Sequence, residues 1–398
     1  MTPRERILAA LDRKEPDRLP IDFGGTDCSS IHVLAYDKLR RAVGIEPRTI
    51  RLGCMMQQIA EVDPELLDCL GSDAQGLYFH PREWRRWESG YGFPVEVAGG
   101  WQPEMLADGA SVVRNAAGEV LSRRTPGGYY FDPAGFVFAG IEDAGEIARH
   151  ESLFARWDWP AVLDESLDAY AKRAQAAYQG TDRAVVALWQ NHYLQAGQVM
   201  RGYEQFMIDL LTDETMVRGL LDRLHAAYME RTRAFLNALG QWVDVVFLTD
   251  DLGTQQGPLI GPEYYRQLIK PYWTEQIALI KSRGKKVIMH SCGAVSDFIP
   301  DMIEMGVDAL NPVQITAQGM SPERLKREFG KDIAFWGGGV NTQGVLDVGT
   351  PQQVRDHVKR TLDIFAQGGG YVFTQVHNIQ ANVPPENILA AYETAREY

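Results

Sequence analysis

The 398-residue chain has 45% hydrophobic and 23% charged residues, a balance that is typical of a soluble globular protein with a sizeable core. Its formal net charge of −13 argues against nucleic acid or an anionic membrane as a main partner. No apolar run reaches about eighteen residues, and four scattered cysteines without a CxxC pair favour a reducing, cytoplasmic setting.

Short apolar runs alternate with longer amphipathic stretches along most of the chain. Such runs predict strands that are covered on both sides, and the stretches between them predict helices that bury one face. The predicted strands are Leu19–Phe23, Ala74–Phe79, Val185–Leu188, Val245–Leu248, Lys286–His290, Ala309–Val313, Ile333–Gly337 and Tyr371–Thr374. Eight strands with intervening helices predict an α/β fold of the (β/α)8 TIM-barrel type, with an open doubly wound sheet as the alternative.

The alternation stops from about Glu88 to Phe138, where Gly, Tyr and Val are frequent and no helical period is seen. Runs typical of antiparallel ribbon occur there at Pro94–Val97, Ser111–Arg114, Val120–Arg124 and Tyr129–Phe131. We interpret residues 88–138 as a β-rich insertion between strands two and three, near the barrel mouth. No linker is evident, so residues 1–398 are predicted to form a single domain.

Polar side chains follow every predicted strand. In barrels of this kind the active site forms where the strands end, because the following loops converge there. The residues at these ends include Asp22, His80, Asn191, His192, Asp250, Asp251, His290, Cys292, Asn311, Gln314, Asn341 and His377. Their convergence predicts an enzyme active site at that end of the barrel.

His290 and Cys292 form the sharpest local motif. Residues i and i+2 of an extended segment point to the same side, so both side chains could bind one ion. A half-buried histidine beside a small buried cysteine is the alternative. His377 follows the eighth strand, which lies across a closed barrel from strand five, and it could complete a three-ligand set. A hydrogen bond from His377 to a loop carbonyl explains that residue equally well.

Neighbouring residues on a strand point in opposite directions, so we expect only one of Asp250 and Asp251 in the site. We favour Asp250 as the inward residue and a general base, with Asp251 as a helix cap or loop anchor. His192 and Asn311 are further catalytic candidates. The candidates for substrate binding are Asp22, His80, Trp189, Asn191 and Asn341.

Several segments resemble the uroporphyrinogen decarboxylase superfamily, which also contains zinc- and corrinoid-dependent methyltransferases. They extend over nearly the whole chain: Arg4–Leu11, Pro16–Pro20, Gly257–Tyr264, His290–Gly293, Asp308–Gln314, Phe335–Gly338, Gly368–Tyr371, His377–Gln380 and Val383–Ile388. The decarboxylase branch carries arginines after the first strand that hold substrate carboxylates. Residues 21–27 have acids and no arginine there. The chain therefore resembles the methyltransferase branch more than authentic uroporphyrinogen decarboxylase.

In that branch, a His-x-Cys pair and a later cysteine hold zinc. His290 and Cys292 match the pair, and His377 stands in place of the later cysteine. Gln314 falls where an acidic ligand is usual, which makes it a candidate fourth ligand. The resemblance implies a metal site of His290, Cys292 and His377.

The resemblance also implies a zinc-dependent methyltransferase that moves a methyl group between a small methoxylated or methylated substrate and a corrinoid protein or a thiol acceptor. A metal-free decarboxylase of a small carboxylated substrate, with His377 and Asp250 as its acid–base pair, is one alternative. A barrel that binds a ligand without catalysis is another. The sequence leaves the oligomeric state open, with a homodimer among the candidates.

Overall fold

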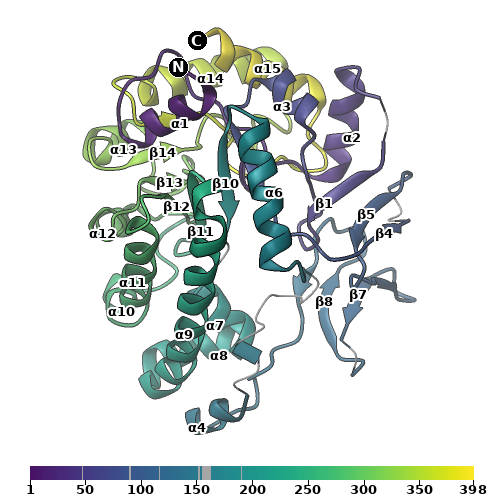
Figure 1. Ribbon diagram of the computed structural model, residues 1–398, viewed down its shortest axis with the longest axis vertical. Coiled ribbons are helices and arrows are strands. Elements are labelled where there is room, and N and C mark those ends of the chain that lie inside the picture. Colours follow the sequence, from purple (N-terminus) through teal and green to yellow (C-terminus); the bar gives the residue numbers. More distant parts are fainter. Residues whose placement is uncertain (47, 89–90, 116, 151–152, 155–162, 190) are drawn as a thin grey trace.

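Parallel strands form the centre of the molecule, and helices surround them (Figure 1). The computed structural model describes residues 1–398 except 47, 89–90, 116, 151–152, 155–162 and 190. Seven parallel strands lie in the order β15-β14-β13-β12-β11-β10-β3. Their bounds are β3 (Ala74–Leu77), β10 (Ala184–Leu188), β11 (Val245–Thr249), β12 (Lys286–His290), β13 (Ala309–Asn311), β14 (Ala334–Trp336) and β15 (Tyr371–Val372).

The segment around Ile21 closes this sheet into a barrel. Ile21 forms a parallel bridge with Phe373, just beyond β15, and the amide of Asp73, just before β3, donates to the Ile21 carbonyl at 2.6 Å. The predicted strand Leu19–Phe23 is therefore reduced to a single bridge, yet it still joins the two edges of the sheet. The predicted (β/α)8 barrel is confirmed, and the open doubly wound alternative is wrong.

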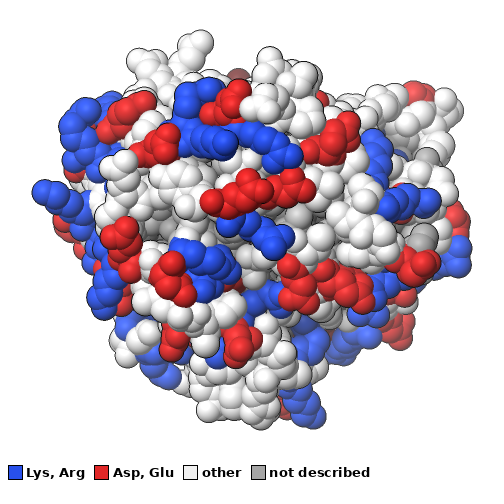
Figure 2. All heavy atoms as spheres, turned by 90° about the horizontal axis from the view of Figure 1, so that it is seen from above, with Lys and Arg blue, Asp and Glu red and all other residues white. Residues whose placement is uncertain are grey.

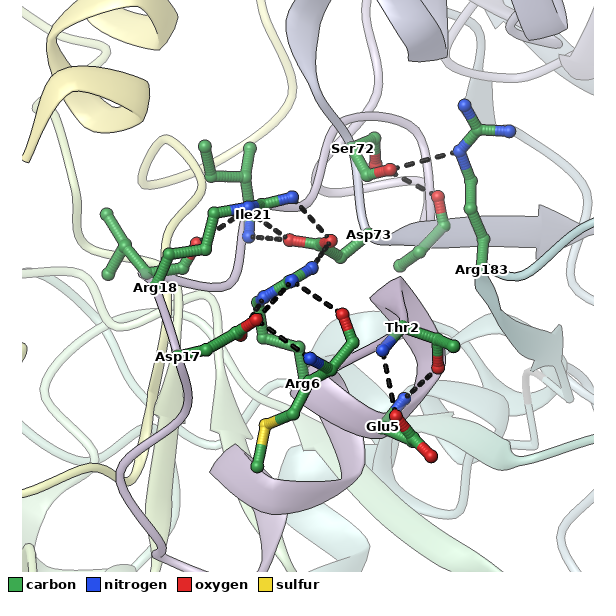
Figure 3. Close-up of polar contacts among 12 residues, drawn as sticks. Thr2, Glu5, Arg6, Asp17, Arg18, Ile21, Ser72, Asp73 and Arg183 are labelled. Carbon is green, nitrogen blue, oxygen red and sulfur yellow. Dashed lines mark hydrogen bonds and ion pairs between the residues drawn. The ribbon is translucent and has the colours of Figure 1, made fainter.

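A buried carboxylate holds the closing segment in place. Oδ2 of Asp73 accepts the backbone N–H of Ile21 at 3.0 Å, and the same carboxylate pairs with Arg6 and Arg18 at 2.6 and 2.8 Å (Figure 3). Because two guanidinium groups and a backbone amide satisfy the buried charge, Asp73 can anchor strand one beside β3.

The inward faces of the strands fill the barrel with apolar side chains. Val245 and Phe247 of β11 belong to this inner cluster, as do Ile288 of β12 and Trp336 of β14. Since strand side chains alternate between the two faces, the residue between Val245 and Phe247 packs outward against the helices. The parity of each strand therefore decides which residues of the following loop can enter the barrel mouth.

Helices cover the outside of the barrel. They are α1 (Pro3–Leu11), α2 (Val33–Ala42), α3 (Pro64–Leu70), α4 (Ala144–Ile147), α6 (Leu167–Gly180), α7 (Leu194–Arg201), α8 (Tyr203–Thr212), α9 (Glu214–Leu239), α10 (Pro262–Tyr264), α11 (Lys270–Lys281), α12 (Ile299–Met305), α13 (Pro322–Phe329), α14 (Pro351–Phe365) and α15 (Pro385–Glu397). Helices α13 and α14 each begin with a proline after a side-chain N-cap, Ser321 and Thr350 respectively. Within the described ranges, no helix has the length and apolar character needed to cross a membrane.

Short strands lie between β3 and β10. They are β4 (Trp84–Trp87), β5 (Val95–Ala98), β6 (Glu104–Met105), β7 (Ser111–Arg114), β8 (Val120–Arg124) and β9 (Asp132–Pro133). Strands β6 to β9 form one antiparallel sheet, while β4 and β5 join β1 (Ile50–Cys54) and β2 (Ile59–Ala60) in another. The runs Ser111–Arg114 and Val120–Arg124 match β7 and β8, whereas the predicted strand Tyr129–Phe131 is displaced to β9. That residues 1–398 form a single domain with an insertion at 88–138 stays a prediction.

Acidic and basic side chains intermingle on the face that carries both termini (Figure 2). Ion pairs occur on the surface of the molecule, for example between Arg355 and Glu393 at 2.9 Å. Such exposed pairs contribute little to stability individually. The net negative charge of the chain is therefore not concentrated as one acidic patch on this face.

Candidate metal and substrate site

His290 ends β12 and is buried at the mouth of the barrel. Its Nδ1 lies 2.8 Å from Oδ1 of Asn311, whose Nδ2 donates to the carbonyl oxygen of Trp336 at 2.9 Å. Because the second bond fixes the orientation of the amide, Oδ1 is the acceptor and Nδ1 of His290 carries the proton. In the neutral ring, Nε2 of His290 then holds the lone pair, and this atom lies 3.4 Å from Sγ of Cys292.

His377, in the loop after β15, is oriented in the same way. Its Nδ1 hydrogen-bonds to Oδ1 of Asn378, so Nε2 keeps the lone pair. The rings of His290 and His377 have their centroids 5.5 Å apart. The structure thus brings together His290, Cys292 and His377, the three side chains that the sequence pointed to as metal ligands.

Cys28 belongs to the same cluster and was missed by the sequence reasoning. It is buried, and its Sγ lies 3.8 Å from Nε2 of His290 and 3.7 Å from Nε2 of His377. Cys28, His290 and His377 form one group of donor atoms within 4.8 Å of one another, and Asp251, His290 and Cys292 form a second. The position of Cys28 could have marked it as a candidate, because the loop after strand one lies at the same rim of the barrel as the other strand-end residues.

The prediction that Asp250 faces the site is wrong. Oδ2 of Asp250 accepts the backbone N–H groups of Tyr193 and Leu194, and Oδ1 accepts that of Gln195, at 2.9–3.1 Å. The indole Nε1 of Trp273 donates to Oδ2 as well. Asp250 is therefore fully buried between the barrel wall and helices α7 and α11, and it cannot be the base of an acid–base pair with His377.

Asp251 is the carboxylate that faces the mouth. Its Oδ1 lies 3.4 Å from Nε2 of His290 and accepts the backbone N–H of Cys292 at 2.9 Å. The physical reason is the parity of β11: Val245 and Phe247 point inward, so odd-numbered residues continue into the mouth. The sequence prediction wrongly took the even-numbered residue, Asp250, to face inward.

Opposite charges within the cluster shift its ionisation. Burial alone raises the pKa of Cys292, but the facing imidazolium groups of His290 and His377 outweigh it and lower that pKa to about 7. The pKa of Cys28 is lowered in the same way, against burial. Burial opposes charge on His290 and His377, yet the two thiolates raise both imidazole pKa values well above the usual range. Without metal, the cluster therefore favours thiolates, which are the form that binds metal.

These donors suit zinc. A tetrahedral zinc site with bonds of about 2.0–2.3 Å separates its ligand atoms by about 3.3–3.8 Å. The three sulfur–Nε2 distances in the cluster, 3.4, 3.7 and 3.8 Å, fall in that range, whereas Sγ of Cys28 lies 3.1 Å from Nδ1 of His290. Gln314, the candidate fourth ligand, uses Oε1 to accept the backbone N–H of Gly293 at 2.8 Å, so that oxygen is already engaged.

Two cavities meet at the cluster. The first, of about 410 Å³, has Cys28, Asp251 and His290 on its wall, and its apolar lining includes Met55, Phe79, Leu163, Trp189, Tyr228 and Phe247. The second, of about 500 Å³, has Cys292 on its wall, and its carboxamide lining comprises Gln57, Gln195, Gln314, Asn341, Gln343, Asn378 and Gln380. We call them the apolar cavity and the polar cavity. His377 lines both.

Four of the residues predicted for catalysis or substrate binding line these cavities. Trp189, Asn191 and His192 lie along the apolar cavity, and Asn341 lies along the polar one. Burial lowers the pKa of His192 to about 4, so its imidazole is neutral at physiological pH. These positions are compatible with the predicted substrate contacts, and for His192 with a hydrogen-bonding role.

The other predicted residues lie elsewhere. Asp22 is buried below the mouth, where its Oδ2 accepts the indole N–H of Trp336 at 2.7 Å. His80 faces Glu61 at 3.1 Å, and neither Asp22 nor His80 is among the described residues that line the two cavities. Asn311 contacts His290 and not a cavity, which makes it a positioning residue.

Comparison with known proteins adds the family. Residues 190–398 match the model of the family described as uroporphyrinogen decarboxylase (URO-D). The chain is 25% identical over 190 residues to uroporphyrinogen decarboxylase of Neisseria meningitidis serogroup C, covering 47% of this chain and 51% of that protein. It is also 25% identical over 191 residues to the methylcobamide:CoM methyltransferase MtbA of Methanosarcina mazei, covering 48% and 52%. The chain thus matches about half the length of these curated relatives.

A solved structure described as a methyltransferase from Methanosarcina mazei resembles the whole chain. The TM-score is 0.60 at 17% sequence identity, and the match covers 100% of this chain and 99% of that one. At this identity, the likeness establishes a shared fold, which agrees with the closed barrel described above.

Proposed function

Because the chain belongs to the uroporphyrinogen decarboxylase (URO-D) family, we propose that it is a zinc-dependent methyltransferase. It would move a methyl group between a small methoxylated or methylated compound and a corrinoid protein or a thiol. The observation that carries this proposal is the meeting of His290, Cys292 and His377 at the wall between an apolar and a polar cavity. The similarity of the chain to MtbA, a methylcobamide:CoM methyltransferase by name, supports the same reaction class.

The proposed ligands are His290, Cys292 and His377. A zinc ion held there would supply Lewis acidity to the oxygen or sulfur that carries or accepts the methyl group. The chain itself prepares the ligands. Asn311 and Asn378 each accept a hydrogen bond from Nδ1 of one histidine, so Nε2 is the nitrogen that would lose its proton and bind the metal in each ring.

The apolar cavity is suited to the methylated compound. Its Trp189 wall is rigid, because Nε1 donates to Thr232 at 3.0 Å and the ring stacks on Phe235 with centroids 4.3 Å apart. Its lining combines this aromatic wall with apolar residues such as Met55 and Leu163 and with charged ones such as Arg231. His192 lines this cavity as a neutral imidazole, and its Nδ1 is buried without a hydrogen-bond partner within the described residues.

The polar cavity is suited to a corrinoid. A corrin ring carries amide side chains, and carboxamides such as Gln314 and Asn341 can donate to and accept from them. No Lys or Arg occurs among the described residues that line this cavity. A porphyrinogen with many carboxylates would lack counter-charges there, which favours methyl transfer over uroporphyrinogen decarboxylation.

The test combines metal analysis with a methyl-transfer assay. We expect about one zinc per chain and, with reduced cobalamin and a panel of methoxylated and methylated compounds, the absorbance change of methylcobalamin formation. Chelator and His290→Ala should each abolish zinc binding and methylcobalamin formation. His150→Ala, at an exposed histidine distant in sequence from the proposed ligands, should leave both unchanged. Full activity of the metal-free protein, or release of carbon dioxide that chelator does not affect, would overturn the proposal.

A further inference from the structure

The loop between strand one and α2 brings a second thiol to the two histidines. Sγ of Cys28 lies 3.7 Å from Nε2 of His377 and 3.8 Å from Nε2 of His290. Sulfur and nitrogen atoms on one tetrahedral zinc ion are about 3.5 Å apart. The Nε2 atoms of both histidines are thus near ligand distance from a buried sulfur that neither the family match nor the sequence motif includes, although this sulfur lies closer still, at 3.1 Å, to Nδ1 of His290.

The loop holds Cys28 firmly in this position. The backbone N–H of Thr26 donates to Oγ of Ser29 at 2.8 Å, and the backbone N–H of Ser29 donates to Oγ1 of Thr26 at 3.0 Å. Nε2 of Gln375 donates to the carbonyl oxygen of Cys28 at 3.4 Å. The tight turn around Cys28 is therefore tied to the same segment that carries His377, as expected of a ligand whose position is set before the metal binds.

The two cysteines reach the histidines from different sides. Cys28 lines the apolar cavity, Cys292 lines the polar cavity, and His377 lines both. Among the described residues, Cys28 shares one donor group with His290 and His377, and Cys292 shares another with His290 and Asp251, so an ion held by both cysteines would have to draw these two groups together at His290. Two thiolates would cancel its two positive charges, which lowers the cost of burying it and selects a soft metal over magnesium or calcium.

We propose that Cys28 is a ligand of the metal, so that His290, His377, Cys28 and Cys292 hold it as two imidazoles and two thiolates. The inference rests on the proposed metal site, but not on methyl transfer. It departs from the expected set of one thiolate and two imidazoles. With four protein ligands, the substrate atom of the proposed reaction would have to enter as a fifth ligand, which zinc accommodates in some catalytic sites. The alternative is that Cys28 only accepts a hydrogen bond from Nδ1 of His290, which lies 3.1 Å from its sulfur.

Cobalt(II) separates these possibilities, because each thiolate ligand adds a sulfur-to-cobalt charge-transfer band. We expect Cys28→Ser and Cys292→Ser each to reduce the near-ultraviolet band of the cobalt-loaded full chain by about half. Cys54→Ser is the matched control, since Cys54 lines the apolar cavity without belonging to either donor group. Asp251→Asn should also leave the intensity unchanged. The inference would be overturned if the band kept its full intensity in Cys28→Ser and disappeared in Cys292→Ser.

A measurement on the wild-type protein covers the case in which a variant does not fold. X-ray absorption at the zinc edge should find two sulfur atoms about 2.3 Å from the metal. One sulfur would overturn the role of Cys28 and leave the proposed methyltransferase standing. No bound metal would overturn both proposals. Methyl transfer that fails while two sulfurs are found would overturn the proposed function alone.

Discussion

His290 and His377 each donate a hydrogen bond from Nδ1 to a carboxamide oxygen. For His290 the amide of Asn311 is itself held by the carbonyl oxygen of Trp336, at 2.9 Å. Such outer contacts fix both the tautomer and the ring orientation of a metal-binding imidazole. The geometry of the proposed site therefore depends on residues that never touch the metal.

We expect Asn311→Ala to weaken zinc binding by about 10–100-fold, because His290 loses the acceptor that keeps its proton on Nδ1. Competition with a chromophoric chelator measures the affinity. Asn237→Ala, at an exposed asparagine whose side chain accepts a hydrogen bond from Arg283, should bind zinc as the wild type does. An unchanged affinity in Asn311→Ala would remove the positioning role.

Asp22 should make the free energy of unfolding depend on pH, and this dependence does not involve the metal. Burial raises its pKa from 3.8 to about 6, and its hydrogen bonds offset only part of that effect. Between these pH values the folded protein holds the Asp22 proton while the unfolded chain has released it, so stability falls as pH rises. Relative to Asp22→Asn, the metal-free wild type should lose up to about 3 kcal/mol of unfolding free energy between about pH 4 and pH 7.

Urea unfolding at several pH values tests this expectation. The difference between the wild type and Asp22→Asn should grow with rising pH, in the direction of a less stable wild type. Asp363→Asn, at an exposed aspartate, should run parallel to the wild type. A difference that is constant with pH would mean that Asp22 is ionised in the folded state throughout.

The sequence predicted part of this chemistry for a physical reason. His290 and Cys292 are two residues apart on a strand, so their common direction follows from strand geometry alone. Cys28 could not be found in that way, because 262 positions separate it from His290 and it lies on a loop. The choice between Asp250 and Asp251 needed the parity of β11, which becomes visible only when Phe247 is known to point inward.

At the scale of elements, α7 depends on a carboxylate from another strand. Its N-cap residue, Tyr193, makes no side-chain capping bond, and Asp250, after β11, accepts the first N–H groups of the helix instead. A carboxylate at this end also interacts favourably with the helix dipole. Asp250 thereby fixes the helix that carries Gln195 and Ala196 along the apolar cavity.

We expect Asp250→Ala to destabilise the protein by about 2–4 kcal/mol, because it leaves several buried N–H groups without an acceptor. Its neighbour provides the matched control. Asp251→Ala removes a carboxylate at the mouth and should alter zinc affinity while costing less stability. Guanidinium unfolding of the metal-free proteins gives the comparison, and equal stability losses in the two variants would contradict the assignment of the pair.

Element boundaries were harder to predict than element types. The sequence predicted Ala309–Val313 as a strand, but β13 ends at Asn311, because Pro312 has no N–H to donate and Val313 has a φ of +60°. Strand one was expected over five residues and is a bridge at Ile21. In both places the run of apolar residues is longer than the segment whose backbone hydrogen-bonds to a neighbouring strand, so the predicted strand was too long.

At the scale of the whole molecule, the donor cluster connects distant parts of the barrel. Cys28 follows strand one, His290 and Cys292 belong to β12 and its loop, and His377 follows β15. Strand one and β15 also meet at the seam where the bridge between Ile21 and Phe373 closes the barrel. A metal bound to these side chains would link the seam to the opposite wall.

Zinc should therefore stabilise the folded barrel by mass action. A ligand that binds only the folded state at a free concentration of 100 times its Kd adds about 2.7 kcal/mol. For a chain of this length, with an unfolding entropy of about 0.8 kcal/mol per kelvin, the melting temperature should rise by about 3 °C. Scanning calorimetry with and without zinc measures the shift. The shift in melting temperature should vanish in His290→Ala and persist in His150→Ala. If zinc left the melting temperature of the wild type unchanged, a site assembled only by folding would be contradicted.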